Sequence, residues 1–213
     1  MNSEIFNLFP ILLKGYKNPN HKFDKQTILQ YKDTNNSYKN NSCDNLIHWG
    51  CNGSDVSVIE EQSLCNFKKW IKDCCVDFIH SCGYDLQSDV IVTDSWINEC
   101  HAGGNQKFHY HTNSFVSGTY YVNYDDTLHA PLQFKRHSID SSQRQSVSLN
   151  RKINTPYATD AAIVPEEGEL FLWESHMTHG YDHNKGDGRV SLSVNFMPEI
   201  LHSGIYKFQI TRV

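Results

Sequence analysis

Two histidines separated by a single residue, His109 and His111, are the residues of this sequence best suited to ligand binding or catalysis. In an extended strand, side chains at positions i and i+2 point to the same side, so both imidazoles could bind one cation while Tyr110 points to the opposite side. A catalytic metal site uses about three protein ligands and keeps a further position open. The best third ligand is the distant His179, which precedes a strand that contains Arg189. The spacing therefore predicts a metal site assembled from two remote segments.

A histidine pair is weak evidence by itself. The chain contains 12 histidines, and such pairs often lie on the surface or in the core of a protein. The later His179 and the arginine on an alternating strand strengthen the metal interpretation. Taken together, these features favour a metal site over an accidental pair.

The segment around Arg189 has the period-two alternation of a β-strand. One face of residues 189–196 is polar and the other is apolar, and residues 116–123 show a similar split. The polar faces carry Arg189, Ser191, Ser193 and Asn195 on one segment and Ser117, Thr119, Tyr121 and Asn123 on the other. The commoner interpretation is a wet outer face. The functional interpretation directs these side chains into a barrel, where an arginine binds a carboxylate bidentately and hydroxyl groups donate further hydrogen bonds.

The elements that must position these residues are mainly short strands. From Glu60 to Cys82, apolar residues recur every three or four positions, which predicts a long helix that packs outside a sheet and ends before Gly83. Strands are predicted over residues 5–13, 89–98, 115–123, 132–135, 162–164, 169–173, 189–196 and 205–212, with a short helix over 22–32, a loop over 33–45 and a mobile loop or lid over 136–160. This order predicts a mainly β fold, a double-stranded β-helix (jelly roll), with a helical buttress.

Length and composition bound the class of protein. The 213 residues fit one domain over 1–213 with a full-sized core. A net charge of −5 without a basic stripe argues against nucleic acid as a partner. No apolar run is long enough to cross a membrane, and the first residues lack the basic start of a signal peptide. The seven cysteines form no CxxC pair, which favours reduced thiols in a cytoplasmic protein.

The predicted metal site also carries a resemblance to a known family. The runs 111–122, 168–175 and 189–196, together with His109 and His179, resemble the core of the Fe(II)- and 2-oxoglutarate-dependent oxygenases. The likeness covers residues 89–198 and is closest to a subgroup found in marine bacteria and their viruses. It implies a jelly-roll core with Fe(II) and 2-oxoglutarate as cofactors and O₂ as co-substrate. For a virus-encoded protein, the location would be the host cytoplasm.

The chain departs from this family at one metal ligand. The family usually supplies two histidines and one carboxylate, whereas the position two residues after His109 is occupied by His111. Either His111 completes a three-histidine site, or a shifted motif that ends at Asn113 leaves a water in the shell. We favour His109, His111 and His179, a neutral set in which dianionic 2-oxoglutarate offsets the charge of Fe(II).

The resemblance also implies how 2-oxoglutarate would bind. Its 2-oxo acid end would chelate the iron, and its far carboxylate would pair with Arg189 and Ser191. Tyr121 would add a hydroxyl contact, and Asn195 a contact near the iron end. These four residues form the predicted co-substrate pocket.

Further residues are predicted to surround the metal. Trp96 and Asn98 would line the mouth for the substrate, although a core position is the plainer expectation for the tryptophan. Glu174 and His176 would orient the distal histidine from a second shell, or simply belong to a turn. Asn113 belongs to this group if it is not a ligand.

The predicted reaction is hydroxylation of an unidentified peptidyl side chain or small metabolite, coupled to conversion of 2-oxoglutarate to succinate and CO₂. A cupin-type metal enzyme is one alternative, but Phe115 and Val116 stand where a cupin motif places a glutamate. A non-catalytic jelly-roll module that binds a sugar or peptide is another. The sequence predicts no particular oligomeric state.

Overall fold

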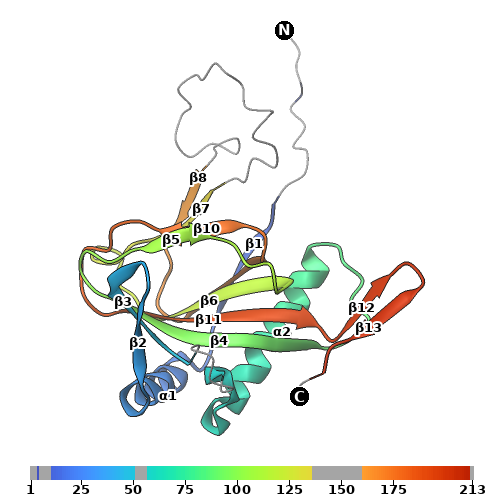
Figure 1. Cartoon of the computed structure of the whole chain (residues 1–213), viewed down its shortest axis with the longest axis horizontal. Helices are drawn as coiled ribbons and strands as arrows, with labels where there is room; N and C mark the ends of the chain where they lie inside the picture. The colour runs from blue at the N-terminus through green and yellow to red at the C-terminus, as the bar shows by residue number, and fades with distance from the viewer. Residues whose placement is uncertain (1–3, 5–10, 51–56, 136–159, 212–213) are drawn as a thin grey trace.

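Two antiparallel sheets form the body of the protein, and a two-stranded hairpin projects to one side of them (Figure 1). The structure is a computed structural model that describes residues 4, 11–50, 57–135 and 160–211. The predicted lid over 136–160 lies almost entirely outside the described residues, as does most of the predicted strand over 5–13.

The larger sheet has seven strands and the smaller sheet has four. In spatial order the larger sheet contains β1 (Leu13–Lys17), β9 (Glu169–Glu174), β6 (Val116–Asn123), β11 (Arg189–Pro198), β4 (Val90–Cys100), β3 (Cys43–Trp49) and β2 (Ser37–Asn40). The smaller sheet contains β5 (Gln106–His109), β10 (Thr178–Tyr181), β7 (Leu132–Lys135) and β8 (Asp160–Ile163). Neighbouring strands are often remote in sequence, and the strand pairs of the described residues are antiparallel. This arrangement confirms the predicted jelly-roll fold.

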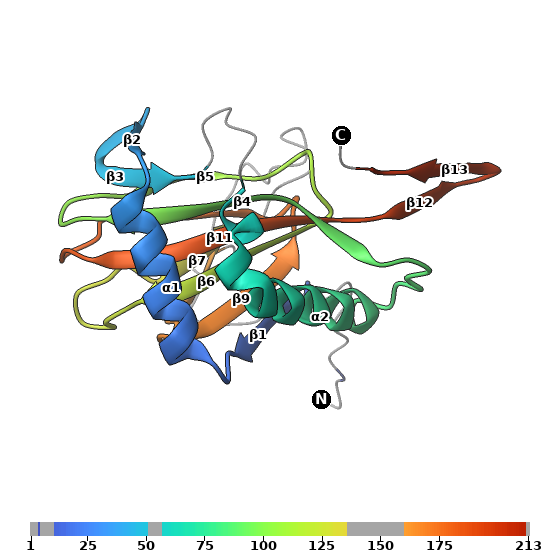
Figure 2. The same cartoon turned by 90° about the horizontal axis from the view of Figure 1, so that it is seen from below.

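Two helices, α1 (His21–Thr34) and α2 (Cys65–Ser81), cover one face of the larger sheet (Figure 2). The apolar stripe predicted for the long helix is buried, with Phe67, Ile71 and Phe78 each at most 1 % exposed. Two short 3₁₀ turns, η1 (Val58–Glu60) and η2 (Gln62–Leu64), lead into α2. The predicted helical buttress is therefore confirmed, and it forms the main hydrophobic core together with the sheet.

Strand alternation determines which side chains reach the space between the two sheets. On β11, Val190, Leu192 and Phe196 pack in the core beneath the helices. Because successive side chains point to opposite faces, Arg189 and Asn195 point away from the helices and line a cavity between the sheets. The polar face of this strand is thus an inner face, as the functional interpretation of its pattern predicted.

One local prediction is wrong, and two others miss a neighbouring strand. The Asn- and Ser-rich stretch over 33–45 is not a loop throughout, because it contains β2 and enters β3, which pair as a hairpin at the edge of the larger sheet. The final strand predicted over 205–212 is present as β13 (Tyr206–Gln209), and it pairs with a strand that was not predicted, β12 (Ile200–Ser203), in a hairpin that turns at Gly204 with φ of 60°. The turn predicted after Trp173 is followed at once by a further strand, β10. In each case strand pairing supplies the backbone hydrogen bonds that local composition does not reveal.

None of the helices among the described residues has the length and apolar character needed to cross a membrane.

Candidate metal centre and co-substrate pocket

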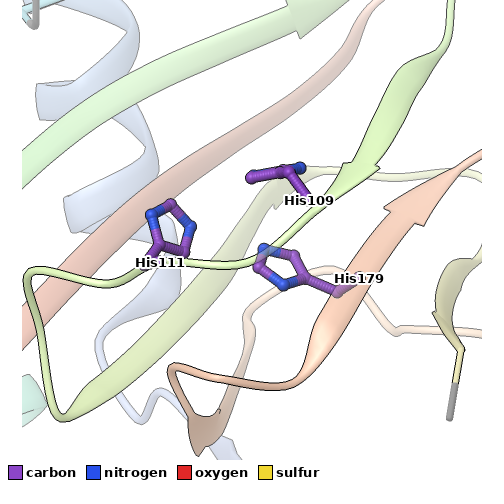
Figure 3. Close-up of side chains that lie close together, drawn as sticks. All are labelled: His109, His111 and His179. Carbon is purple, nitrogen blue, oxygen red and sulfur yellow. The ribbon is translucent and has the colours of Figure 1, made fainter. Parts of the chain in front are cut away.

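The three predicted histidine ligands lie together at one end of the smaller sheet (Figure 3). His109 is the last residue of β5, and His179 lies directly opposite it on the antiparallel strand β10. Side chains of such cross-strand partners are close neighbours on one face, and the two ring centroids are 4.5 Å apart. A contact between residues remote in sequence is thus fixed by strand register.

The close approach of β10 to β5 depends on a small residue. A Cβ atom placed on Gly180 would lie 2.7 Å from the carbonyl oxygen of Gln106 and 3.1 Å from the Cα of Phe108. Real Cβ atoms do not tolerate the first of these distances, so a larger residue would push the strands apart beside His179. The glycine next to the ligand therefore helps to bring the two histidines into contact.

His111 reaches the site from just beyond the end of β5 rather than from within the strand. Its backbone N–H donates to the carbonyl oxygen of Ser175 at 2.9 Å, which holds the segment against the turn before β10. Its ring lies 5.1 Å from that of His109 and 5.3 Å from that of His179 between centroids. Tyr110 is 49 % exposed, consistent with the outward side chain predicted for it.

Backbone carbonyls fix the protonation pattern of two of these rings. Nδ1 of His109 lies 2.8 Å from the carbonyl oxygen of Lys107, and Nδ1 of His179 lies 2.9 Å from that of Met177. A carbonyl oxygen only accepts hydrogen bonds, so each Nδ1 carries the proton and each Nε2 keeps its lone pair for a metal. This is the outer-shell support that metal-binding histidines usually have.

Burial keeps the site neutral. Desolvation lowers the pKa of His179 to about 3, with smaller contributions from His109 and His111 and an opposing one from the Met177 carbonyl. Desolvation, followed by the charge of His109, lowers the pKa of His111 to about 4. Both imidazoles are therefore deprotonated near neutral pH, which is the form that binds a metal ion.

The geometry suits one first-row metal ion. The three ligand nitrogens lie within 4.8 Å of one another. Such an ion lies about 2.0–2.1 Å from each imidazole nitrogen, which places the nitrogens about 3–4 Å apart. Small rotations of the rings would achieve this spacing, and imidazole ligands suit iron among other transition metals.

Arg189 is the buried cation of the neighbouring pocket. It is 2 % exposed, its Nε donates to the carbonyl oxygen of Ala130 at 3.1 Å, and its guanidinium lies over the Tyr181 ring at 3.9 Å from the centroid. The guanidinium is also 5.3 Å from the ring centroid of Tyr121. A charge this deeply buried requires an anionic partner or aromatic faces to offset its lost hydration.

Three buried polar atoms in the described chain have no hydrogen-bond partner, and all three belong to residues that line the cavity. They are the hydroxyls of Tyr121 and Tyr181 and the indole Nε1 of Trp173. Buried polar groups are rarely left unpaired. Donors without partners beside a buried guanidinium are the expected surroundings of an anionic ligand, so the residues fit the far carboxylate of a keto-diacid.

A chain of short hydrogen bonds orients Asn195. Ser114 donates to Ser175, Ser175 lies 2.8 Å from Ser117, and the hydroxyl of Ser117 donates to Oδ1 of Asn195 at 2.8 Å. Because its oxygen already accepts this bond, Asn195 offers its amide N–H groups to the cavity. The turn after β9 is thereby tied to β6 and β11.

One cavity of about 510 Å³ connects the metal centre to the arginine. It contains all the predicted co-substrate residues and both predicted mouth residues, namely Arg189, Ser191, Tyr121, Asn195, Trp96 and Asn98. Three other predicted residues are absent from its lining. Asn113 and His176 are exposed, and Glu174 accepts a hydrogen bond from the hydroxyl of Tyr84. The ring of His179 is instead held by a backbone carbonyl, so a second-shell side chain is not required there.

Sequence reasoning missed several cavity residues. Tyr181 and Trp173 flank the arginine and the distal histidine, and His48 and Asn40 lie at the other end. The strand predicted over 169–173 included Trp173, but its run of four apolar residues gave no sign of which face the tryptophan occupies. The residues from the β2–β3 hairpin carried no signal, because that stretch was predicted as a loop.

The comparisons with known proteins agree with this geometry. A family model described as "Putative 2OG-Fe(II) oxygenase" matches residues 94–195, which include every candidate ligand and the arginine. No curated protein matches the chain.

Solved structures share the fold at very low identity. A 2OG-Fe(II) oxygenase family oxidoreductase from Burkholderia pseudomallei has 9% identity and a TM-score of 0.57, covering 84% of this chain and 79% of its own. A prolyl-4-hydroxylase from Pseudomonas putida has 10% identity and a TM-score of 0.56, covering 88% and 92%. HygX from Streptomyces hygroscopicus, solved with nickel, 2-oxoglutarate and hygromycin B, has 7% identity and a TM-score of 0.57, covering 88% and 83%. The family model thus matches the segment that carries the candidate site, and the solved structures share the fold of the chain.

Proposed function

We propose that this protein is an Fe(II)- and 2-oxoglutarate-dependent dioxygenase that hydroxylates a peptidyl side chain or a small metabolite. The observation that carries the proposal is the placement of three imidazoles and one buried guanidinium in a single cavity. The family match and the shared fold support the same chemistry. A cupin or a plain binding module would not require the buried Arg189.

The residues divide the work between the two sheets. His109, His111 and His179 would hold Fe(II), while Arg189 and Ser191 would bind the far carboxylate of 2-oxoglutarate, with Tyr121 donating to it. Asn195 would position the end near the iron. When bound, Fe(II) and 2-oxoglutarate supply the oxidative decarboxylation of the co-substrate to succinate and CO₂ together with oxygen insertion into the substrate. The protein orients the reactants and limits access of water.

Burial makes Tyr121 a hydrogen-bond donor and strengthens the attraction of Arg189 for an anion. Tyr121 is fully buried, and desolvation raises the pKa of its phenol to about 12, against the opposing effect of the nearby Arg189 charge. The hydroxyl therefore stays protonated and acts as a hydrogen-bond donor. Removal of the guanidinium from water strengthens its attraction to a carboxylate.

The resemblance to a marine bacterial and viral subgroup and a location in the cytoplasm are also part of the proposal. They rest on the sequence runs around the site and on the composition of the chain.

Anaerobic absorption spectroscopy tests the proposal. Purified protein with Fe(II) should give a weak visible charge-transfer band only when 2-oxoglutarate is added. On exposure to O₂, 2-oxoglutarate should be converted to succinate, and a true substrate should gain the mass of one oxygen atom. A band without 2-oxoglutarate would favour a cupin-type enzyme, and no iron binding at all would reject the proposal.

A further inference from the structure

The cavity extends across the larger sheet from β11 to β4 and the β2–β3 hairpin, and the proposed co-substrate contacts on β6 and β11 do not use this end. This end is lined by Asn40 and His48 of the β2–β3 hairpin and by Trp96 and Asn98 of β4. The Trp96 ring lies 5.9 Å from that of His111 between centroids, which places Trp96 beside the metal centre. Alternate residues of β4 lie about 6.6 Å apart, and Asn98, one such repeat from Trp96, lies opposite Ser191 of β11.

A hydrogen-bond chain joins these residues in one direction. The backbone N–H of Ser42 lies 2.8 Å from Oδ1 of Asn40, and this fixes the orientation of the Asn40 amide. Its Nδ2 therefore donates to Nε2 of His48 at 2.9 Å. Since Nε2 accepts, the proton of the neutral ring is on Nδ1, which donates to Oδ1 of Asn98 at 2.8 Å. The Nδ2 of Asn98 then donates to the hydroxyl of Ser193 at 2.9 Å.

The direction of this chain decides what the end of the cavity can offer to a ligand. Oδ1 of Asn40, Nε2 of His48 and Oδ1 of Asn98 each already accept a hydrogen bond from the protein. Each side-chain amide nitrogen has two N–H groups and uses one of them in the chain. Asn40 and Asn98 therefore each keep an N–H group to donate, which suits a ligand group that accepts hydrogen bonds.

The charges around the cavity favour an anion. Among the described residues that line it there is no Asp or Glu. The next step rests on the proposed function. If Fe(II) and 2-oxoglutarate bind as proposed above, the charges of the ion and the dianion cancel and the three imidazole ligands are neutral. The charge of Arg189 then leaves the site with one net positive charge. An uncompensated charge in a partly buried site is costly, and a single substrate anion would balance it.

We propose that the β2–β3 end of the cavity is the substrate site and that it binds a carboxylate group of the substrate through the side-chain amide N–H groups of Asn98 and Asn40. His48 is a positioning residue that holds the Asn98 amide with its nitrogen available. Trp96 forms the wall between the anchored carboxylate and the metal. The substrate is thus a small carboxylic acid or a side chain that bears one.

Matched pairs of acids and carboxamides test this assignment. Full-length protein would be loaded with Ni(II) and saturated with 2-oxoglutarate without O₂, so that Arg189 is occupied. Benzoate against benzamide and N-acetylglycine against its amide would be titrated by NMR or calorimetry. We expect each acid that binds to do so at least tenfold more tightly than its amide.

Two variants locate the preference. Asn98→Asp keeps the shape of the side chain and can still accept from His48, but its carboxylate repels an anion, so the preference for the acid should be lost. Lys107→Met, which removes a positive charge from an exposed position outside the cavity lining, should match the parent protein.

Equal binding of acids and amides by the parent protein would overturn the proposal. So would undiminished acid binding by the Asn98→Asp variant, which is the result expected if the acid ligates the metal instead. A separate titration of 2-oxoglutarate into the parent protein tests the proposed function. If 2-oxoglutarate does not bind but the protein still prefers acids to their carboxamides, the proposed function is rejected and the carboxylate site is kept.

Discussion

Arg189→Met should separate co-substrate binding from metal binding. The guanidinium lies on β11 in the larger sheet, whereas two of the three histidines lie on strands of the smaller sheet. Its hydrogen bond from Nε to the Ala130 carbonyl uses one of five N–H groups. Methionine fills a similar volume without charge, so the change removes the ion pair with little repacking.

The size of the effect follows from the chemistry of the contact. A hydrogen bond to a charged group contributes about 1.5–3 kcal/mol, and each 1.4 kcal/mol corresponds to about a tenfold change in affinity. The dissociation constant for 2-oxoglutarate should therefore rise about 10- to 150-fold. The affinity for Ni(II) should stay within about twofold of the parent value, because no histidine ligand contacts the arginine.

Isothermal titration of Ni(II), and then of 2-oxoglutarate into the nickel-loaded protein, measures both quantities without turnover. Lys185→Met is a matched control, because it removes one positive charge from an exposed position outside the cavity. Unchanged 2-oxoglutarate affinity in Arg189→Met would refute the assignment of this residue to the far carboxylate. A parallel loss of nickel affinity would show that the variant perturbs the whole site.

Three further predictions concern the ligands and the fold. His111→Ala should lower Ni(II) affinity at least tenfold in anaerobic titrations while Asn113→Ala leaves it unchanged, and the reverse result would move the third ligand position. Burial lowers the pKa of His111 to about 4 and of His179 to about 3, below the ordinary value of about 6.5, so the unfolded chain binds protons that the folded apo-protein does not. Its stability to urea should therefore fall as the pH drops from about 6.5 towards 4, with a shallower slope in His111→Leu, and identical slopes would contradict this cause. Gly118→Ala should destabilise the protein by about 1–3 kcal/mol in urea unfolding, because the new Cβ would meet the backbone oxygen of Phe171 at 2.9 Å. Gly15→Ala, which meets only the end of the Phe171 ring, should cost less, and equal costs would argue against the backbone clash.

Much of the fold could be predicted from periodicity. The stripe over residues 60–82 and the alternation over 189–196 correspond to α2 and β11. The helix buries its apolar stripe, whereas the strand buries its apolar face beneath the helices and its polar face in the cavity. The β2–β3 hairpin could not be predicted, since its Asn- and Ser-rich residues favour turns and its pairing depends on an edge provided by β4. Strand β10 was missed for a similar reason, as its four residues are defined by partners on both sides.

The candidate site was predicted in part. The pairing of His109 with His179 was inferred from residue types, and the structure brings them together through register that the sequence does not show. The role expected of His176 was wrong in its physical basis, because a backbone carbonyl holds the distal ring, and any residue can supply a carbonyl. Tyr181 was missed because an aromatic residue on an unrecognised strand has no predicted face.

The division of the cavity between two sheets has a further consequence. The metal side and the guanidinium side are carried by separate layers, so if 2-oxoglutarate binds as proposed, the gap between the layers sets the length of the acid that can bridge them. A keto-diacid one carbon shorter or longer would distort the spacing of the two sheets or lose its contact with either the metal or Arg189. Larger side chains packed between the sheets would therefore change the length of the diacid that binds best.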